Sequence, residues 1–402
     1  MDRRQGQPAQ LDRLGRQSDQ QSRQLQQFLD EAAAAGVFPG GVLLYGNPAQ
    51  GVCDTLCCGK RGVTRDRVEV KPDLIYDLAS LTKIISTTTL FMMTLDKGLI
   101  DLDSPLASLG WEIKGSLKKA TIRRLLAHQS GLPAWRPYHQ DDSLSQDDDG
   151  LLEDDSLLEE DGLLEDDSLL EEESLLVNNA LKTAILRETL ECDPGQRTIY
   201  SDLNFMLLGM ILVERWEKRL ESLFKTLISQ PLGLLSCGFN PSGRNIAPTE
   251  DGFRIGGPLD YRGAPIKGPV PLGTVHDDNA RAQNGVSGHA GLFSSAQDVW
   301  KVVRLWAEAF DDSKRSLVSK GAMDEFLCAC RPKSGAARAL GFDLGQGTLQ
   351  GARGHTGYTG PSLWWNPQKD RAFVFLCNRV HPTARASKME NFRKELADRL
   401  WG

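Results

Sequence analysis

Segments with strand-like sequences lie at both ends of the chain, and helix-like sequences fill its middle. Near the N-terminus, the apolar stretches 41–45 and 52–58 predict two strands. Near the C-terminus, short apolar stretches separated by turn residues predict an antiparallel meander followed by a helix, at 339–344, 354–356, 362–365, 371–377 and 387–401. Strands from both ends can share one sheet if the middle of the chain forms an inserted lobe. The pattern therefore predicts an α+β fold: an antiparallel sheet built from both chain ends and flanked by helices, plus an inserted, mainly helical lobe.

Charge is distributed unevenly along the 402 residues. Hydrophobic residues make up 40% and charged residues 25%, as in an ordinary globular enzyme. The formal net charge is -7, but residues 141–173 hold 17 acidic residues and no Lys or Arg, so the rest of the chain carries +10. The basic residues do not form a dense run interleaved with aromatics. Nucleic acid is therefore not an expected partner.

The N-terminal sequence and the cysteines bear on the compartment. Residues 1–20 are polar and rich in Gln and Arg, which predicts a disordered arm without the apolar region of a signal peptide. No stretch approaches 18 apolar residues, so we expect no membrane span. The eight cysteines form no C-x-x-C pair and no Cys/His ligand spacing, and the sequence has no H-x-H-x-D cluster. We therefore expect a cytoplasmic protein with neither a metal nor a cofactor.

A six-residue repeat, with units such as GLLEDD and SLLEED, runs through residues 150–179. Six residues advance a helix by about 600°, so successive leucine pairs do not share one apolar face. In a strand the adjacent leucines would point to opposite sides. We interpret this low-complexity insert, at 141–176, as a disordered expansion of a surface loop. The alternative is a substrate lid, because the insert lies between residues 135–138 and the helix that leads to Tyr200.

A possible nucleophile lies where a strand gives way to a helix. Residues 74–79 are typical of a strand entering a turn, and the apolar stretch after them predicts a buried helix ended by Gly98. Ser80 would begin this helix, and Lys83 would follow one turn later on the same face. An amine within reach of the hydroxyl could activate it as a nucleophile. Alone, the S-x-x-K pattern is equally compatible with a helix cap and a surface lysine.

Two further motifs follow in a fixed order, Tyr200-Ser201-Asp202 and His355-Thr356-Gly357. With these three motifs, and with the segments YDLASLTK, DPGQRTIYSDLNFMLLG and GHTGYTGPSLWW, the chain resembles the serine β-lactamase and penicillin-binding-protein superfamily. The resemblance is to the branch that holds class C β-lactamases, D,D-peptidases, D-aminopeptidases and related esterases. It extends from about residue 40 to the C-terminus, interrupted by the insert. It implies a β-lactamase/transpeptidase-like fold.

The resemblance also implies roles for the first two motifs. Ser80 would be the nucleophile, Lys83 the general base or part of it, and Tyr200 a group that passes protons between nucleophile, leaving group and water. Asp202 replaces the asparagine of many relatives, and a carboxylate beside Lys83 favours its charged form. We therefore expect Tyr200 to carry more of the base work, with Lys83 as a cation that lowers its pKa. A second registration would take Ser201 as the motif serine.

The third motif departs from the family pattern K-T-G. His355 stands in place of the lysine, a variant that resembles D-aminopeptidases and esterases more than dedicated β-lactamases. Thr356 and Gly357 would border the substrate. By resemblance, the backbone N–H groups of Ser80 and Tyr358 would form an oxyanion hole.

Three other histidines are candidates for the same region. We interpret His128 as structural. His289 could support the site or simply pack, and His276 lies on a polar loop that could border the cleft.

These observations predict a serine hydrolase that forms an acyl-enzyme on small esters or D-amino-acid amides and peptides. The alternatives are a β-lactamase or D,D-carboxypeptidase, and a non-catalytic binding or scaffold protein on the same fold. The expected partner is the small-molecule substrate, while the oligomeric state is left open. The hydrolase domain would span 21–402, with an α/β lobe at 21–85 and 290–402 and a helical lobe at 86–289.

Overall fold

The computed structural model describes residues 7–63, 67–141, 144, 179–250, 270–312, 316–384 and 388–402. The acidic insert predicted at 141–176 lies almost wholly outside these ranges. Within them, no helix combines the length and the apolar character needed to cross a bilayer.

A six-stranded antiparallel sheet joins the two ends of the chain, as predicted. Its strands run in the order β2-β1-β9-β8-β7-β6. The N-terminal strand β1 pairs along its length with the last strand, so that Gly41 lies opposite Cys377 and Leu44 opposite Val374. The strand bounds are β1 Gly40–Asn47, β2 Val52–Gly59, β6 Asp343–Leu344, β7 Arg353–Thr356, β8 Ser362–Asn366 and β9 Arg371–Cys377. The predicted strand at 339–344 is therefore reduced to its last two residues.

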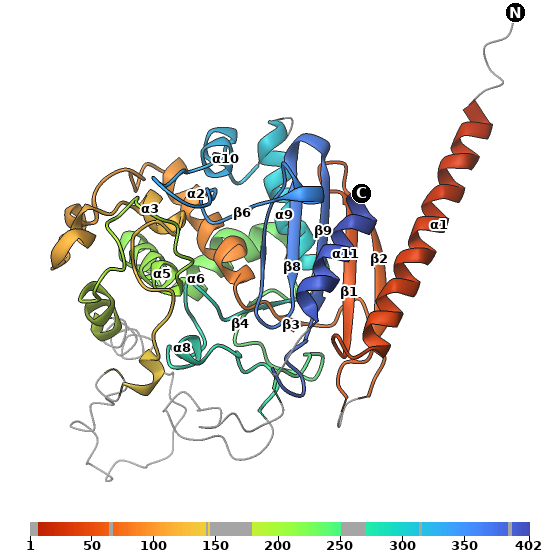
Figure 1. The fold of residues 1–402 in the computed structure, drawn as a ribbon, viewed down its shortest axis with the longest axis horizontal. Coiled ribbons are helices and arrows are strands. Elements are labelled where there is room, and N and C mark those ends of the chain that lie inside the picture. The colour runs from red at the N-terminus through yellow and green to blue at the C-terminus, as the bar shows by residue number, and fades with distance from the viewer. Residues whose placement is uncertain are drawn as a thin grey trace, which may run out of the picture.

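Helices cover both faces of this sheet (Figure 1). On one face α1 (Gln7–Ala34) and α11 (Met389–Trp401) pack together, with the rings of Phe28 and Phe392 stacked at 5.2 Å. On the other face α9 (Ala296–Asp311) presents Trp306 to Trp365 of β8. The helix α1 begins at Gln7, so the prediction of a disordered arm over 1–20 is wrong for residues 7–20. The Gln, Arg and Leu residues there are good helix formers, and this local preference outweighs the low hydrophobicity.

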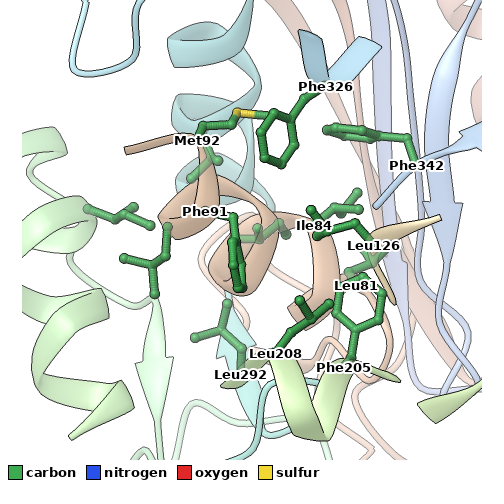
Figure 2. Close-up of a cluster of buried hydrophobic side chains, with 14 of the residues drawn as sticks. Leu81, Ile84, Phe91, Met92, Leu126, Phe205, Leu208, Leu292, Phe326 and Phe342 are labelled. Carbon is green, nitrogen blue, oxygen red and sulfur yellow. The ribbon is translucent and has the colours of Figure 1, made fainter. Parts of the chain in front are cut away.

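The helical lobe lies beside the sheet and is organised around one buried segment. That segment consists of η1 (Lys83–Thr88), which has the wide turns of a π-helix, and α2 (Thr89–Asp96). All six residues of η1 are buried. Figure 2 shows the side chains of this segment, including Phe91, surrounded by apolar residues from several other elements, including Phe205 and Phe326. The helix that carries Ser80 is thus held on all sides by the core.

The longest helix of the lobe is α5 (Asp202–Trp216), and residues 179–186 are also helical. The other helical elements outside the sheet are short: η2 Leu106–Leu109, η3 Gly115–Lys119, α3 Ile122–Leu126, η4 Tyr138–Gln140, α6 Leu220–Phe224, η6 Lys225–Ser229, α7 Gln230–Leu232, α8 Asp278–Arg281 and α10 Lys320–Leu327. Two further short turns of helix, η7 Gly347–Leu349 and η8 Pro367–Lys369, connect strands of the six-stranded sheet. A second, three-stranded sheet has the order β3-β5-β4, with β3 Tyr76–Asp77, β4 Gly238–Phe239 and β5 Leu292–Ser294. The strand predicted at 74–79 is only these two residues of β3, because the chain turns sharply immediately afterwards.

Candidate active site

The turn before Ser80 has a strained backbone that hydrogen bonds hold in place. Ala79 has φ of 45°, a left-handed conformation that is uncommon for any residue other than glycine. Its backbone N–H donates to the buried carboxylate of Asp77 at 2.8 Å. Three residues later, the backbone N–H of Thr82 donates to the Ala79 carbonyl at 3.0 Å. The half-buried Ser80 therefore leaves β3 in a fixed direction, at the start of the central helix.

Lys83 lies fully buried beneath Ser80. Its Nζ is 2.9 Å from Ser80 Oγ, 2.7 Å from Asp202 Oδ1 and 3.0 Å from the carbonyl oxygen of His289. The contacts with Ser80 and His289 are hydrogen bonds, and the contact with Asp202 is an ion pair. Burial alone would lower the pKa of Lys83, but the negative charge of Asp202, with Tyr200, outweighs it and raises the pKa above its ordinary value. Lys83 is therefore a cation at neutral pH.

Tyr200 approaches the same serine from the other side. Its hydroxyl donates to Ser80 Oγ at 2.9 Å. The Lys83 ammonium is 5.2 Å from the centre of the Tyr200 ring, and the Arg338 guanidinium is 5.5 Å from it. Loss of solvation raises the pKa of Tyr200 more than Lys83 lowers it. Lys83 thus lowers the pKa of Tyr200 as expected, but the loss of solvation has the larger effect. The phenol of the resting site therefore keeps its proton.

Ser201 is oriented away from Ser80. Its backbone N–H donates to His128 Nδ1 at 3.0 Å, and its hydroxyl donates to the carbonyl of Pro133 at 2.6 Å. His128 is fully buried, and its ring lies 4.6 Å from that of Tyr200. These contacts place Tyr200 rather than Ser201 against Ser80, and they agree with the structural interpretation of His128.

His355 is buried behind Tyr200, with 5.5 Å between the two ring centres. Its Nδ1 lies 2.7 Å from the carbonyl of Thr356, which fixes the proton on Nδ1 and leaves Nε2 as an acceptor. Burial lowers the pKa of His355 to about 4, with a smaller contribution from the nearby cation Arg338. Histidine in place of lysine thus removes a positive charge from this position.

Arg338 supplies a positive charge nearby that the motifs do not reveal. One nitrogen, Nη1, pairs with Asp343. The other two, Nε and Nη2, are buried and have no hydrogen-bond partner within the described part of the chain. The same is true of His355 Nε2. An unpaired donor group and an unpaired acceptor thus lie close to Tyr200.

The turn after Thr356 is pressed against the backbone that precedes Ser80. A Cβ at Gly357 would lie 2.7 Å from the carbonyl oxygen of Leu78, so only glycine fits there without a shift of the turn. The backbone N–H groups of Ser80 and Tyr358 make no hydrogen bond within the described ranges. Two free N–H groups on adjoining turns are the donors that an oxyanion hole requires.

A second group of polar residues supports Lys83. His289 Nε2 lies 2.8 Å from Asp277 Oδ1, and His289 Nδ1 lies 2.8 Å from the hydroxyl of Ser287. The carbonyl of the same histidine accepts from Lys83. The backbone of His289 thus contacts Lys83, while its ring is held by Asp277 and Ser287. His276, on the same loop, stacks against the ring of Tyr358 at 5.6 Å.

Sequence patterns did not point to Asp77, Arg338 or the pairing of Asp277 with His289. The sequence gives none of these residues a distinct role, and only the buried contact reveals it. No group of three or more His, Cys, Asp or Glu side chains that could hold a metal ion occurs among the described residues.

One serine hydroxyl held between a buried lysine ammonium and a phenol, on a strand-turn-helix junction, defines a serine hydrolase built for acyl transfer. The chain belongs to the Beta-lactamase family, whose model matches residues 23–398. It is 28% identical over 334 residues to the "Putative D-alanyl-D-alanine carboxypeptidase" of Salmonella agona, a match that covers 76% of this chain and 70% of that protein.

Solved structures share the fold. EstCE1, a hydrolase with promiscuous acyltransferase activity, matches with a TM-score of 0.68 and 20% identity over 96% of this chain and 100% of its own. The D-amino acid amidase from Ochrobactrum anthropi matches with a TM-score of 0.65 and 16% identity over 95% and 99% of the two chains. The predicted β-lactamase/transpeptidase-like fold is therefore confirmed.

Proposed function

We propose that this enzyme cleaves small amides, peptides or esters that contain D-amino acids, with Ser80 as the nucleophile. The observation that carries the proposal is the contact of Ser80 Oγ with both Lys83 Nζ and Tyr200 Oη, each at 2.9 Å. The Salmonella agona relative, named for a D-alanyl dipeptide substrate, supports the choice of substrate class.

The eight cysteines are free thiols, which fits a reducing compartment, and we place the enzyme in the cytoplasm.

Tyr200 is the group that receives the proton of Ser80. In the resting site Ser80 Oγ accepts from both neighbours, and one of them must become an acceptor before the serine can attack. The Lys83 ammonium has no lone pair, and Asp202 keeps it charged. A neutral phenol retains lone pairs. Tyr200 can therefore take the proton of Ser80 while it passes its own phenolic proton to the leaving nitrogen or oxygen.

This shuttle is compatible with the raised pKa of Tyr200, because the phenol stays neutral before and after the transfer. The new bond joins Ser80 Oγ to the substrate carbonyl carbon, and the bond to the leaving group breaks. In the second half of the reaction, water attacks the acyl-enzyme, gives its proton to Tyr200, and Ser80 recovers its hydrogen. Lys83 remains a cation throughout and stabilises the negative charge that develops at Ser80.

The backbone N–H groups of Ser80 and Tyr358 stabilise the carbonyl oxygen as it becomes negative. Both are free of other partners in the described residues, and the helix that begins after Ser80 adds a favourable dipole. Gly357 allows the two turns to approach closely enough for both donors to reach one oxygen.

A D,D-carboxypeptidase is the second candidate, and Arg338 is the observation that favours it. A peptide that ends in a carboxylate needs a cation near the leaving group, and the neutral His355 does not provide one. The unpaired Nε and Nη2 of Arg338 could bind that carboxylate after a local rearrangement that exposes them.

Intact mass spectrometry tests the proposed reaction. Wild type and Ser80→Ala are exposed briefly to a p-nitrophenyl ester, to D-phenylalanine amide and to a penicillin. Acylation of the wild type alone supports the proposal, whereas equal labelling of both proteins would contradict it. A lasting penicilloyl adduct would point to a peptidase-like site.

A matched substrate pair separates the two candidates. N-acyl-D-Ala-D-Ala and its C-terminal amide differ only in the terminal carboxylate. If Arg338 binds the terminal carboxylate, the wild-type enzyme cleaves the free acid faster than the amide, and Arg338→Met cleaves the two compounds at similar rates. Equal wild-type rates on the two compounds would contradict the carboxypeptidase proposal and would be compatible with the amidase or esterase activity.

A further inference from the structure

Arg393 of the C-terminal helix α11 contacts the turn that carries Tyr358. A single guanidinium nitrogen, Nη2, lies within hydrogen-bond distance of the carbonyls of Gly357 at 2.7 Å, Gly360 at 2.9 Å and Pro361 at 3.0 Å, so at least one of its two hydrogens is shared between two acceptors. Burial lowers the pKa of Arg393 to about 10, which still leaves it charged at neutral pH. One cation therefore gathers three carbonyl oxygens of a five-residue turn.

The contact with Gly357 has a direct consequence for the oxyanion hole. The carbonyl of Gly357 and the N–H of Tyr358 belong to the same peptide unit, which is planar and trans. In such a unit the C=O and the N–H point in opposite directions. Because Arg393 and the Gly360 N–H, at 3.2 Å, both hold the Gly357 oxygen, the Tyr358 N–H must point away from α11.

Other contacts limit the remaining freedom of the turn. Arg379 Nε donates to the Tyr358 carbonyl at 2.6 Å, and its guanidinium lies 4.4 Å from the centre of the Tyr358 ring. The Thr359 hydroxyl donates to the backbone carbonyl of Asp77 at 2.8 Å. Asp77 is the residue whose side chain fixes the turn before Ser80. Hydrogen bonds through Asp77 thus link the turn of Tyr358 to the turn of Ser80, and Arg393 links it to α11.

We propose that Arg393 is a positioning residue that aims the Tyr358 N–H at the reacting carbonyl and so couples the C-terminal helix to catalysis. The inference rests on the proposed function, in which that N–H stabilises the oxyanion. Arg393 acts through the peptide unit and does not touch the substrate. Its loss should therefore weaken transition-state binding and leave ground-state binding almost unchanged.

The test compares Arg393→Met with Arg399→Met in the full chain. Arg399 lies on the same helix but is exposed, with its guanidinium 4.4 Å from the ring of Phe28. We expect Arg393→Met to lower kcat by about tenfold or more with KM within about twofold, below the roughly hundredfold effect of removing an oxyanion donor outright. Binding of phenylboronic acid, which forms a tetrahedral adduct with an active serine, should weaken by the same factor. Arg399→Met should leave both quantities within about twofold of wild type.

Two additions keep the result decisive. Arg393→Lys retains a cationic donor and should recover most of the lost activity. Arg393→Gln, which removes the charge and shortens the side chain, takes the place of the methionine variant if that variant does not fold, and the same fall in kcat is expected of it. Hydrogen exchange of the peptide that spans 354–361 should be faster in Arg393→Met than in wild type or Arg399→Met. Unchanged kcat and boronate binding in a folded Arg393→Met protein would overturn the proposal, as would a loss of thermal stability alone.

Failure of the proposed function has a different signature, because it shows in wild type as an absence of Ser80-dependent acylation. The exchange experiment still tests, in that case, whether Arg393 holds the turn that carries Tyr358. Unchanged exchange at 354–361 would then overturn it.

Discussion

Asp202 holds Lys83 in its charged form: the carboxylate oxygen Oδ1 and the ammonium Nζ are 2.7 Å apart, and the lysine side chain is fully buried. A buried lysine without this partner would tend to lose its proton. The Asp202 carboxylate therefore keeps Lys83 a cation, and in the proposed mechanism the proton transfer falls to Tyr200.

Asp202→Asn should move the alkaline limb of the pH–rate profile to lower pH. Lys83 has a raised pKa, so its positive charge persists until the pH passes that value and is lost above it. Asparagine removes the main contribution that raises the pKa and leaves burial, which lowers it. Measurement of kcat/KM from pH 6 to about 11 checks this prediction. If a neutral lysine were the base, the substitution would instead raise activity near neutral pH.

Tyr200→Phe should lower kcat by about 10² to 10⁴, the usual contribution of a positioned acid–base group. The ring would still pack against His128 and His355, so thermal stability should change little. Stopped-flow release of p-nitrophenol separates acylation from deacylation, and both steps should slow. An effect confined to one step would contradict a shuttle that serves both.

His355→Gln should flatten the stability profile of the protein on the acidic side. The pKa of His355 is about 4 in the folded state, against about 6.5 for an unperturbed histidine. Between about pH 6.5 and 4, His355 therefore binds a proton in the unfolded chain but not in the folded protein. The resulting loss of stability grows as pH falls towards 4 and amounts to about 3 kcal/mol. His128, whose pKa is also lowered by burial, is common to both proteins, so the difference between their urea unfolding curves isolates His355.

Gly357→Ala should damage catalysis more than folding. The added Cβ would meet the Leu78 carbonyl at 2.7 Å, and this contact forces the Tyr358 turn away from Ser80. We expect kcat to fall at least about tenfold with a secondary structure that is unchanged by circular dichroism. Gly321→Ala in α10 is the matched control, because the nearest atom to its Cβ would be Ser319 Oγ at 3.7 Å. Equal losses in the two variants would argue against the turn's role.

The strands and the order of the motifs were predictable because both depend on short-range patterns. Apolar stretches bounded by turn residues marked the strands β1, β2, β7, β8 and β9 to within about two residues. Ser80 and Lys83 lie together because a helical turn brings them together, whatever surrounds them. The contact of Tyr200 with Ser80, across 120 residues, was inferred from the family resemblance, and the fold then placed the two atoms 2.9 Å apart.

The residues that tune the site were not predictable from the same patterns. No pattern in the sequence distinguishes Asp77, Asp277, Arg338 and Arg393 from similar polar residues that lie on a protein surface. Their effects arise from burial and from partners that are distant along the chain. The raised pKa of Tyr200 is a further example, because desolvation outweighs the nearby Lys83 cation.

The amino-acid sequence by itself determined the kind of fold and the chemical groups that the site contains, since local patterning and residue identity are enough for both. Only the tertiary structure decided which group carries a charge, which way each peptide N–H points and which oxygen is held by which donor. Those properties depend on distances of about 3 Å and on the exclusion of water, and packing alone sets both.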